Sequence, residues 1–540
     1  MRRACSKKCA KPMAVLVILA SSFVVHGFPT TAEGPSKPVT APLDPKLNPV
    51  ATDLPESDPS FERPDPKFQP QQISVSLSYN YDSVWISWVT GEFQIGEETL
   101  PMDPDSVQSI VHYRESDGCE DKNETGYSTV YDQHDPSQSL YNYASGIIHH
   151  VQLTGLKPKT LYQYRCGDPS LSAMSAVYYF RTMPESTSKD YPSRIVVAGS
   201  LGLTYNTSDT WGHILPNHPD LVLLVGGFSY ADTYITNGTK LGCSSCHHNR
   251  NVTCSELSYG QELGYQPRWD YWGRFMEPLT ANVPTMLVAG EHEIEAQSDN
   301  QTFVAFSSRF IFPSNESCSF TPLYYSFNAG GIHFIVLNPY TAYDSASDQY
   351  KWLENDLKNI NRSETPWVVA AWTAPWYSTF KERYREAECM RVQLEDLLYS
   401  SRVDIVFNGE VDAYERSNRV YNYTLDPCGP VYMTVGAGGC GKLEVEHADD
   451  GPGNCSVLCE ICGERFCSSN FMPWPENGAS CPDRQPDYSA YRESSFGFGM
   501  LEVKNETHAL WSWKRNQDSY LLAGDIIYIV RQPKLCPVSN

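Results

Sequence analysis

Short apolar runs, several of them followed by a glycine or a polar turn, alternate with helical stretches from about Arg194 onward. Runs of this length are typical of strands buried on both faces, and the stretches between them are long enough to form helices. The pattern therefore predicts a layered α/β fold in which sites form at the ends of the strands. The runs are Ile195–Ala198, Leu221–Val225, Thr285–Ala289, Phe334–Leu337, Trp367–Ala371, Asp404–Phe407 and Val431–Val435.

An earlier segment, from about Ile73 to Met183, has a different pattern. Its apolar residues alternate with polar ones in short stretches that turn residues separate, which predicts strands. Gly155–Tyr164 resembles the late strands of a fibronectin type III sandwich, including the tyrosine corner. No titratable cluster accompanies these strands, so we expect a structural domain. The stretches are Ile73–Ser78, Val84–Val89, Ile110–Tyr113, Ile148–Leu153, Leu161–Cys166 and Ala176–Phe180.

Together the two patterns predict a two-domain α+β protein, because 540 residues exceed what one hydrophobic core supports. We place a fibronectin type III-like β-sandwich at residues 73–185. A larger β-sandwich flanked by helices follows at residues 190–540. A Pro-rich leader at residues 33–72 is expected to wrap around the protein or to float free of it. An insertion at residues 440–481 carries six cysteines.

The N-terminus has the pattern of a signal peptide over residues 1–32, with an approximate cleavage site. Its apolar stretch, Met13–Val25, follows a basic segment and is too short to span a bilayer, although an N-terminal anchor is the alternative. No second run of that kind follows, so no membrane span is expected. The sequence predicts secretion to the apoplast or cell wall, with delivery to the vacuole as the alternative.

Cysteines, sequons and charge agree with this prediction. Of the 17 cysteines, 15 lie beyond the signal segment, and an oxidising compartment would pair most of them in disulfides. Cys459-x-x-Cys462 leaves a zinc ribbon as the alternative for the insertion. The net charge of −23 argues against nucleic acid as a partner. Sequons predict N-glycosylation at Asn123, Asn206, Asn237, Asn251, Asn300, Asn315, Asn361, Asn422, Asn454 and Asn505.

The turns after five of the apolar runs form a series with a fixed order. They read Gly199-Ser-Leu-Gly, Gly226-Gly-Phe-Ser-Tyr, Gly290-Glu-His-Glu, Thr373-Ala-Pro-Trp-Tyr and Gly409-Glu-Val-Asp. The series resembles the purple acid phosphatases of the metallophosphoesterase superfamily, whose pattern is GDxG, GDxxY, GNHE, HxPWY and GHxH. The resemblance runs from about residue 50 to the end and is strongest to the large, phytase-like plant branch. It implies a metallophosphoesterase-like domain at residues 190–540 with a C-terminal purple acid phosphatase region.

The resemblance also implies a chemistry. Family members hold Fe together with Zn, Mn or a second Fe, and the two ions clamp a phosphoryl group and generate a hydroxide nucleophile. Hard oxygen ligands suit Fe(III), and imidazole suits the divalent ion. An active member would therefore be a metal-dependent acid phosphatase or phytase that hydrolyses phosphomonoesters.

Only one of the seven ligand positions of the family is retained here, as Tyr230. His292, the histidine of the GNHE motif that is not a ligand, survives as a residual catalytic residue. Arg383 stands for a substrate-side histidine of related enzymes, and Ala437 replaces the aspartate of a GDGG motif. The remaining ligand positions carry Ser200, Gly227 in place of the bridging aspartate, Glu291, Thr373, Glu410 and Asp412.

These substitutions remove the bridge between the metals and every imidazole ligand, so we expect no cofactor. The new carboxylates would repel a phosphate by about 3 kcal/mol per charge pair at about 5 Å. The sequence therefore predicts a secreted pseudoenzyme that binds an unknown partner or ligand, either as a homodimer or as a heterodimer with an active relative. Two alternatives stay open. One is an active acid phosphatase with an altered metal site. The other is a single hard cation, such as Ca²⁺ or Mn²⁺, held by the oxygen atoms of Tyr230, Glu291, Glu410 and Asp412.

Overall fold

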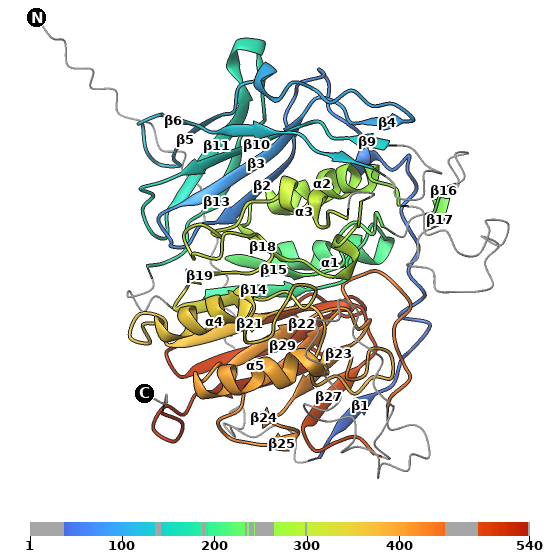
Figure 1. Ribbon diagram of the computed structural model, residues 1–540, viewed down its shortest axis with the longest axis vertical. Helices are drawn as coiled ribbons and strands as arrows, with labels where there is room; N and C mark the ends of the chain where they lie inside the picture. The colour runs from blue at the N-terminus through green and yellow to red at the C-terminus, as the bar shows by residue number, and fades with distance from the viewer. Residues whose placement is uncertain are drawn as a thin grey trace, which may run out of the picture. The chain divides into compact units, whose positions relative to one another are not determined.

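The computed structural model describes most of the chain (Figure 1). The predicted signal peptide, most of the cysteine-rich insertion, and the sequons at Asn237, Asn251 and Asn454 lie outside the described residues. Within the described part of the chain, no helix has the length and apolar character to cross a bilayer. The described residues are 37–134, 142–185, 191, 193–232, 235–236, 242–243, 264–297, 300–448 and 484–537.

Two antiparallel sheets form the N-terminal β-sandwich. One has the strand order β2-β3-β10-β7, and the other has the order β12-β11-β5-β6 with β13 added beside β11. A small sheet of β4, β9 and β8 lies beside them. The strands are β2 (Gln71–Leu77), β3 (Val84–Thr90), β4 (Gln94–Gly96), β5 (Ile110–Glu115), β6 (Lys122–Thr125), β7 (Tyr127–Thr129), β8 (Asp132–Gln133), β9 (Asn142–Ala144), β10 (Ile147–Leu153), β11 (Leu161–Asp168), β12 (Ala173–Met174) and β13 (Tyr178–Arg181).

The tyrosine corner of this sandwich is present. The hydroxyl of Tyr162 accepts a hydrogen bond from the backbone N–H of Lys157 at 2.9 Å. Tyr162 is buried and its ring stacks on Phe180 with centroids 5.6 Å apart. The fibronectin-like arrangement expected from the sequence is confirmed at this position, because the hydroxyl fixes the turn that precedes β11.

The larger domain is also a two-sheet structure. Its eight-stranded sheet has the order β1-β27-β23-β26-β22-β21-β20-β19, and its six-stranded sheet has the order β18-β15-β14-β28-β29-β30. Small hairpins pair β16 with β17 and β24 with β25. The strands are β1 (Val39–Ala41), β14 (Ser193–Ala198), β15 (Leu221–Val225), β16 (Ile235–Thr236), β17 (Gly242–Cys243), β18 (Thr285–Val288), β19 (Tyr325–Ala329), β20 (Ile332–Val336), β21 (Trp367–Ala371), β22 (Ile405–Asn408), β23 (Tyr414–Ser417), β24 (Val420–Tyr421), β25 (Thr424–Leu425), β26 (Val431–Val435), β27 (Ser489–Glu493), β28 (Gly497–Val503), β29 (His508–Arg515) and β30 (Asp525–Val530).

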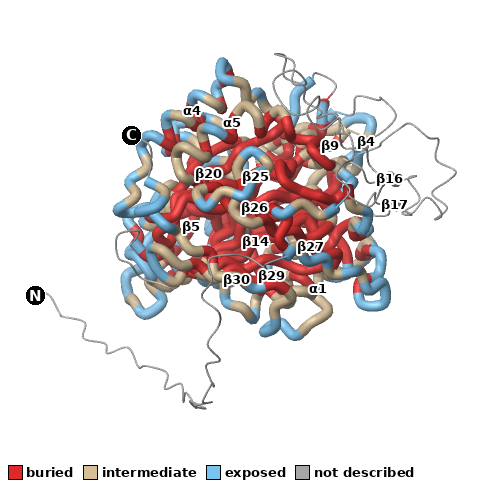
Figure 2. Tube along the Cα trace, turned by 90° about the horizontal axis from the view of Figure 1, so that it is seen from below, coloured by how far each residue is buried: buried red, intermediate tan, exposed pale blue. Residues whose placement is uncertain are grey.

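Strand β21 shows how the sequence divides two cores. Its side chains alternate, so that Trp367 and Val369 join the core between the two sheets while Val368 and Ala370 join a second core under helices. This is why the run lacks polar residues and is buried throughout. Figure 2 shows that buried residues fill the interior of the molecule and that exposed ones lie at its periphery. Helices α4 and α5 cover the second core (Figure 1). The helices are α1 (Tyr205–Ile214), α2 (Pro267–Thr280), α3 (Val304–Arg309), α4 (Asp348–Lys358) and α5 (Glu388–Ser400).

The fold predicted from the apolar runs is confirmed, and each run forms a strand. The C-terminal strands β27 to β30 were not predicted individually. Strand β28 lies antiparallel to β14 in the centre of the six-stranded sheet, so the end of the chain completes the core.

The leader wraps around the protein. Its strand β1 pairs in parallel with β27, and Asp53 forms a β-bridge with Thr204. The backbone N–H of Leu54 donates to the carbonyl of Leu203 at 2.8 Å. The leader therefore lies against the loop that follows β14.

A buried ion pair connects the two sandwiches. Arg309 Nη2 lies 3.2 Å from Asp270 Oδ2, and the two side chains are only 5% and 2% exposed. The hydroxyl of Tyr143 donates to the same carboxylate oxygen at 2.6 Å, and Arg309 Nη1 donates to Gln72 Oε1 at 2.9 Å. Tyr143 and Gln72 belong to the N-terminal sandwich, so the pair depends on both domains for its hydrogen bonds.

Some of the cysteines form disulfides, as expected for an oxidising compartment, and others are free thiols. Cys428 and Cys536 form a disulfide with each other. Cys389 and Cys440 each belong to a disulfide as well. Cys166 and Cys318 are free thiols, of which Cys166 is buried.

The Arg309–Asp270 pair generates a stability prediction. Asp270→Asn keeps the shape of the side chain but leaves the buried guanidinium of Arg309 without its anion. We expect the free energy of unfolding to fall by about 3 kcal/mol, because a buried charge without a partner is costly. Urea unfolding followed by tryptophan fluorescence measures the change. The matched control is Asp487→Asn, whose partner Arg484 is 70% exposed, and it should cost less than about 0.5 kcal/mol. Equal losses in the two variants would contradict the prediction.

Candidate functional site

The loops that follow five strands meet in one place. The backbone N–H of Ser200 donates to Gly226 O at 2.9 Å, that of Gly409 donates to Thr373 O at 2.9 Å, and that of Glu291 donates to Glu410 Oε1 at 3.2 Å. Loops from both sheets of the larger domain are thereby joined, as the sequence predicts for strand ends. Ser200 follows β14, Gly227 and Tyr230 follow β15, Glu291 and His292 follow β18, Thr373 follows β21, and Glu410 and Asp412 follow β22.

Arg383 lies in the middle of the carboxylates of this pocket. Its Nη1 donates to Glu291 Oε2 at 2.9 Å and to Glu386 Oε1 at 3.1 Å, and its Nη2 donates to Glu291 Oε1. Glu410 Oε2 lies 4.0 Å from the same guanidinium. The Arg383 side chain is 18% exposed. One guanidinium therefore pairs with three carboxylates, and we call these four residues the Arg383 cluster.

Burial and charge act against each other in the cluster. Burial raises the pKa of Glu386 to about 7, although the attraction of Arg383 opposes that rise. Burial likewise raises the pKa of Glu410, whose Oε1 accepts from the hydroxyl of Tyr340 at 2.7 Å. Burial alone would lower the pKa of Arg383, but Glu410, Glu291 and Glu386 raise it well above its ordinary value. Arg383 stays charged and supplies the compensation that the carboxylates need.

His292 forms a second cationic group. Its Nδ1 lies 2.9 Å from Asp232 Oδ2, and its Nε2 lies 3.5 Å from Glu291 Oε1. Burial would lower the pKa of His292, but the charge and hydrogen bond of Asp232, with Glu291 and Glu293, raise it to about 9. At neutral pH the imidazole therefore carries a positive charge.

Tyr230 fills the space beside Gly227. Gly227 has a φ of +66°, and a Cβ atom at this residue would lie 2.8 Å from Tyr230 Oη and 3.0 Å from Ser200 Cα. The Tyr230 ring packs on His292 with centroids 4.1 Å apart. Burial raises the pKa of the Tyr230 hydroxyl well above its ordinary value, and Asp412 adds to the rise. The loop is thus adapted to glycine, because an aspartate would meet both steric and backbone strain.

The other predicted positions lie close by but are less engaged. Thr373 is fully buried and its hydroxyl makes no well-aligned hydrogen bond within the described residues, although it is near enough to lower the pKa of Glu410 slightly. The Asp412 side chain forms no hydrogen bond with the described residues. Burial raises the pKa of Asp412 well above its ordinary value, and Glu382 raises it further.

Four residues of the pocket were not predicted from the sequence. Glu293 is fully buried and accepts from the backbone N–H groups of Gly290 and Phe228 at 2.8 and 2.9 Å. It is the last residue of the Gly290-Glu-His-Glu motif, so a signal was present. Glu386 lies three residues after Arg383, a spacing that brings charges together. Asp232 and Tyr340 have no comparable signal in the sequence.

The residues of the pocket do not fit an Fe and Zn pair. That pair needs a bridging carboxylate, which Gly227 lacks, and imidazole ligands, of which the described pocket retains only the protonated His292. Among the described residues, no group of three or more His, Cys, Asp or Glu side chains is arranged to hold a metal ion. Glu291 and Glu410 face the guanidinium of Arg383, which occupies the centre between their oxygen atoms.

The His292–Asp232 pair predicts a pH dependence. The folded pKa of about 9 exceeds the ordinary value of 6.5. The stabilisation from this pair is therefore fully present below pH 6.5 and is lost as the pH rises through 9. Asp232→Asn should cost on the order of 2 kcal/mol at pH 6 and much less at pH 9.5, measured by urea unfolding at both values. The control is Asp117→Asn, an exposed carboxylate whose removal should cost little at either pH. A pH-independent cost for Asp232→Asn would contradict the assignment.

Gly227 yields a second prediction. Gly227→Asp restores the carboxylate of the family motif but places it where Tyr230 lies and where φ is positive. We expect a loss of more than about 2 kcal/mol in the free energy of unfolding. Gly227→Ala is the matched control, because it carries the backbone cost and the Cβ contacts with Tyr230 and Ser200 but not the carboxylate. A Gly227→Asp variant as stable as the unmodified protein would show that the loop still accepts the bridging residue.

Comparisons with known proteins agree over the whole chain. The profile of the purple acid phosphatase N-terminal domain matches residues 70–182, that of the calcineurin-like phosphoesterases matches residues 194–410, and that of the iron/zinc purple acid phosphatase-like protein C matches residues 472–522. A purple acid phosphatase from yellow lupin (Lupinus luteus) seeds has a TM-score of 0.64 at 18% identity, over 86% of this chain and 75% of that chain.

Curated relatives are still more similar. Purple acid phosphatase 13 of Arabidopsis thaliana is 68% identical over 99% of both chains. Purple acid phosphatase 15 of the same plant is 56% identical over 95% of both. Another relative from this plant, 32% identical over 89% of this chain and 88% of its own, has the name Fe(3+)-Zn(2+) purple acid phosphatase 12.

These relatives correct one prediction. The expectation that no cofactor is involved is wrong, since the matching proteins form a family of metal-dependent enzymes and one carries its Fe and Zn ions in its name. The expectation rested on the ligand positions alone and gave no weight to how similar the rest of the chain is to those enzymes. On these matches, the chain belongs to the purple acid phosphatase family.

Proposed function

We propose that this protein is a secreted member of the family that does not hydrolyse phosphomonoesters and instead acts by binding a partner. One observation carries the proposal, namely the Arg383 cluster at the meeting point of the strand-end loops. A substrate phosphate would have to enter the space that Arg383 and its three carboxylates already fill.

Charge supports the same proposal. Arginine binds phosphate well when its donors are free, but both Nη atoms of Arg383 already donate to Glu291 and Glu386. A phosphate dianion that displaced these contacts would lie next to Glu291, Glu386 and Glu410. Each charge pair would cost about 3 kcal/mol at about 5 Å and an effective dielectric near 20.

Disulfides and glycosylation sites support the location. Cys428–Cys536 is a disulfide of a kind that persists in oxidising compartments. The predicted glycosylation sites Asn123, Asn300, Asn315, Asn361, Asn422 and Asn505 are exposed, as attachment of a glycan requires, and Asn206 is partly exposed. We propose an extracellular location, with the vacuole as the alternative. The partner is a second copy of this chain or an active relative that shares its fold.

A metal-dependent acid phosphatase is the second candidate, and a specific observation favours it. The relatives that are 68% and 56% identical over nearly the whole chain are both named purple acid phosphatases. Metal ions belong to this candidate, because the family uses them to polarise the phosphoryl group. Arg383 would then have to leave the pocket so that the oxygen atoms of Glu291, Glu410, Asp412 and Tyr230 face the ion.

The discriminating experiment measures turnover and metal together on the full glycosylated protein. Hydrolysis of p-nitrophenyl phosphate is assayed with and without added Fe, Zn and Mn, and bound metal is quantified by elemental analysis of the same sample. We expect no turnover above a heat-killed control under any of these conditions, because the Arg383 cluster excludes the phosphate.

If turnover is observed, two variants show whether it arises in the pocket. Glu410→Gln removes a carboxylate of the pocket, and Glu354→Gln removes an exposed carboxylate on α4. Metal-dependent turnover that falls about 100-fold in Glu410→Gln and is unchanged in Glu354→Gln would establish the second candidate and refute the first.

A further inference from the structure

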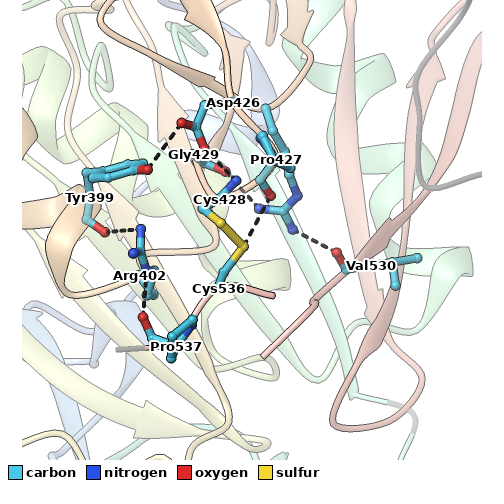
Figure 3. Close-up of a disulfide and its surroundings, with 10 residues drawn as sticks. Tyr399, Arg402, Asp426, Pro427, Cys428, Gly429, Val530, Cys536 and Pro537 are labelled. Atoms are coloured by element: carbon cyan, nitrogen blue, oxygen red, sulfur yellow. Dashed lines mark hydrogen bonds between the residues drawn. A yellow bond between two sulfur atoms is a disulfide. The ribbon is translucent and has the colours of Figure 1, made fainter. Parts of the chain in front are cut away.

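Three arginines line one small cavity beside the disulfide that ties down the end of the chain, outside the strand-end pocket. Arg402, Arg419 and Arg531 line a cavity of about 30 Å³, together with Asp404 and the Cys428–Cys536 disulfide. Figure 3 shows this disulfide, with Arg402 directed at Pro537 and the loop of Asp426, Pro427 and Gly429 beside it. None of these residues takes part in the pocket described above.

Each of the three guanidinium groups donates hydrogen bonds to the protein, and each has one nitrogen atom without an acceptor among the described residues. Arg402 donates through Nε to Pro537 O at 3.0 Å and through Nη1 to Tyr399 O at 3.2 Å. Its Nη2 has no acceptor among the described residues. The hydrogen bonds to backbone carbonyl groups orient this guanidinium and leave its Nη2 available to donate.

The other two guanidinium groups follow the same pattern. Arg419 donates through Nη1 to Gly429 O at 2.8 Å and through Nη2 to Val530 O at 3.0 Å, which leaves its Nε. Arg531 donates through Nε to Asp404 Oδ1 at 3.0 Å and through Nη1 to Glu506 O at 2.8 Å, which leaves its Nη2. Each of the three arginines that line the cavity thus has one donor without an acceptor in the described part of the chain.

Positive charge exceeds negative charge around the cavity. Asp404 is already shared between Arg531 at 3.0 Å and Arg362 at 3.2 Å. Asp426, the carboxylate drawn in Figure 3, accepts from Tyr399 and from the backbone of Cys428. Among the described residues, neither Arg402 nor Arg419 has a carboxylate within ion-pair distance. Burial lowers the pKa of Arg419 and of Arg362. The charge of Asp404 opposes both shifts, and the nearby charge of Arg531 adds to them.

We propose that this cavity binds a small oxyanion of the phosphate or sulfate class, with Arg402, Arg419 and Arg531 as its donors. Arginine presents planar N–H pairs that match the oxygen atoms of such an anion, and a bound dianion would balance the unpaired charge of Arg402 and Arg419. The cavity is about twice the size that one water molecule needs, so a single oxyanion group fits and a whole nucleotide does not.

The disulfide contributes the wall of this site. Cys536 Sγ contacts Pro427 O, and the bond to Cys428 keeps Cys536 and Pro537 beside Arg402 (Figure 3). Because Pro537 O accepts from Arg402 Nε, the covalent link indirectly orients one of the three guanidinium groups. Arg402 and Cys536 are separated by the whole C-terminal part of the domain, so without the link the wall would rest on weak contacts.

Isothermal titration calorimetry with inorganic phosphate and, separately, sulfate tests the proposal on the full glycosylated protein. We expect saturable binding, with sulfate competing if the site recognises the tetrahedral dianion and not phosphate alone. Arg402→Gln and Arg419→Gln should each raise the Kd about tenfold through the loss of a charge-assisted contact. Arg402 is partly exposed, so Arg402→Gln remains informative if Arg419→Gln does not fold. Arg484→Gln is the matched control, since Arg484 is an exposed arginine, and it should leave the Kd unchanged.

Two results would overturn the proposal. One is no saturable heat up to about 50 mM phosphate or sulfate, which would make the cavity a site for an adventitious ion only. The other is binding that Arg383→Gln abolishes and Arg402→Gln leaves intact, which would place the anion in the strand-end pocket. The proposal is independent of whether the protein hydrolyses phosphomonoesters, because neither outcome depends on turnover.

Discussion

The carbonyl oxygen of Val225 lies between two glycines that belong to different sheets. A Cβ atom at Gly199 would lie 2.5 Å from this oxygen, and one at Gly409 would lie 2.2 Å from it. Only residues without side chains allow β14, β15 and β22 to end so close together, and three of the five loops of the pocket start from these ends. The glycines of the motifs are therefore required by packing, whatever the neighbouring residues do chemically. This explains why glycines stand at the strand ends of the pocket.

Charge compensation in the pocket comes from within the chain. Arg383 and the protonated His292 supply two positive groups among Asp232, Glu291, Glu386 and Glu410. Several of the residues involved adopt left-handed backbone conformations, with φ of 51° at Ser200, 59° at Arg383 and 64° at Glu410. Backbone strain of this kind persists only where the surrounding structure holds the residue in place. Here the contacts between the loops hold these residues in their left-handed conformations. The pocket is thus built around an ion-pair network, whereas the relatives that are 68% and 56% identical to this chain are named as enzymes.

Patterns with a short range in sequence predicted the fold well. The apolar run Trp367–Ala371 became β21 without a change in bounds, because burial on both faces leaves a continuous apolar signal. The strand-end motifs also predicted that Ser200, Glu291 and Glu410 would meet. Contacts that depend on the direction in which a side chain points could not be predicted from the sequence. The position of Arg383 between three carboxylates depends on a loop conformation that no periodicity records, and β28 and β29 place aromatic and small residues in the core without a clear apolar run. The cofactor prediction failed for a further reason, since it weighed a few positions above the similarity of the whole chain.

The parallel pairing of β1 with β27 has a consequence for how the protein acquires its structure. Arg492 Nε donates to Thr40 Oγ1 across 452 positions of sequence, so the first strand of the eight-stranded sheet pairs with one of the last to be synthesised. Contacts of such long range form slowly because a large loop must close before they stabilise anything. The edge of that sheet therefore stays open until almost the entire chain has emerged from the ribosome. During this interval the leader has no strand to pair with, and an unpaired strand edge can pair with another chain.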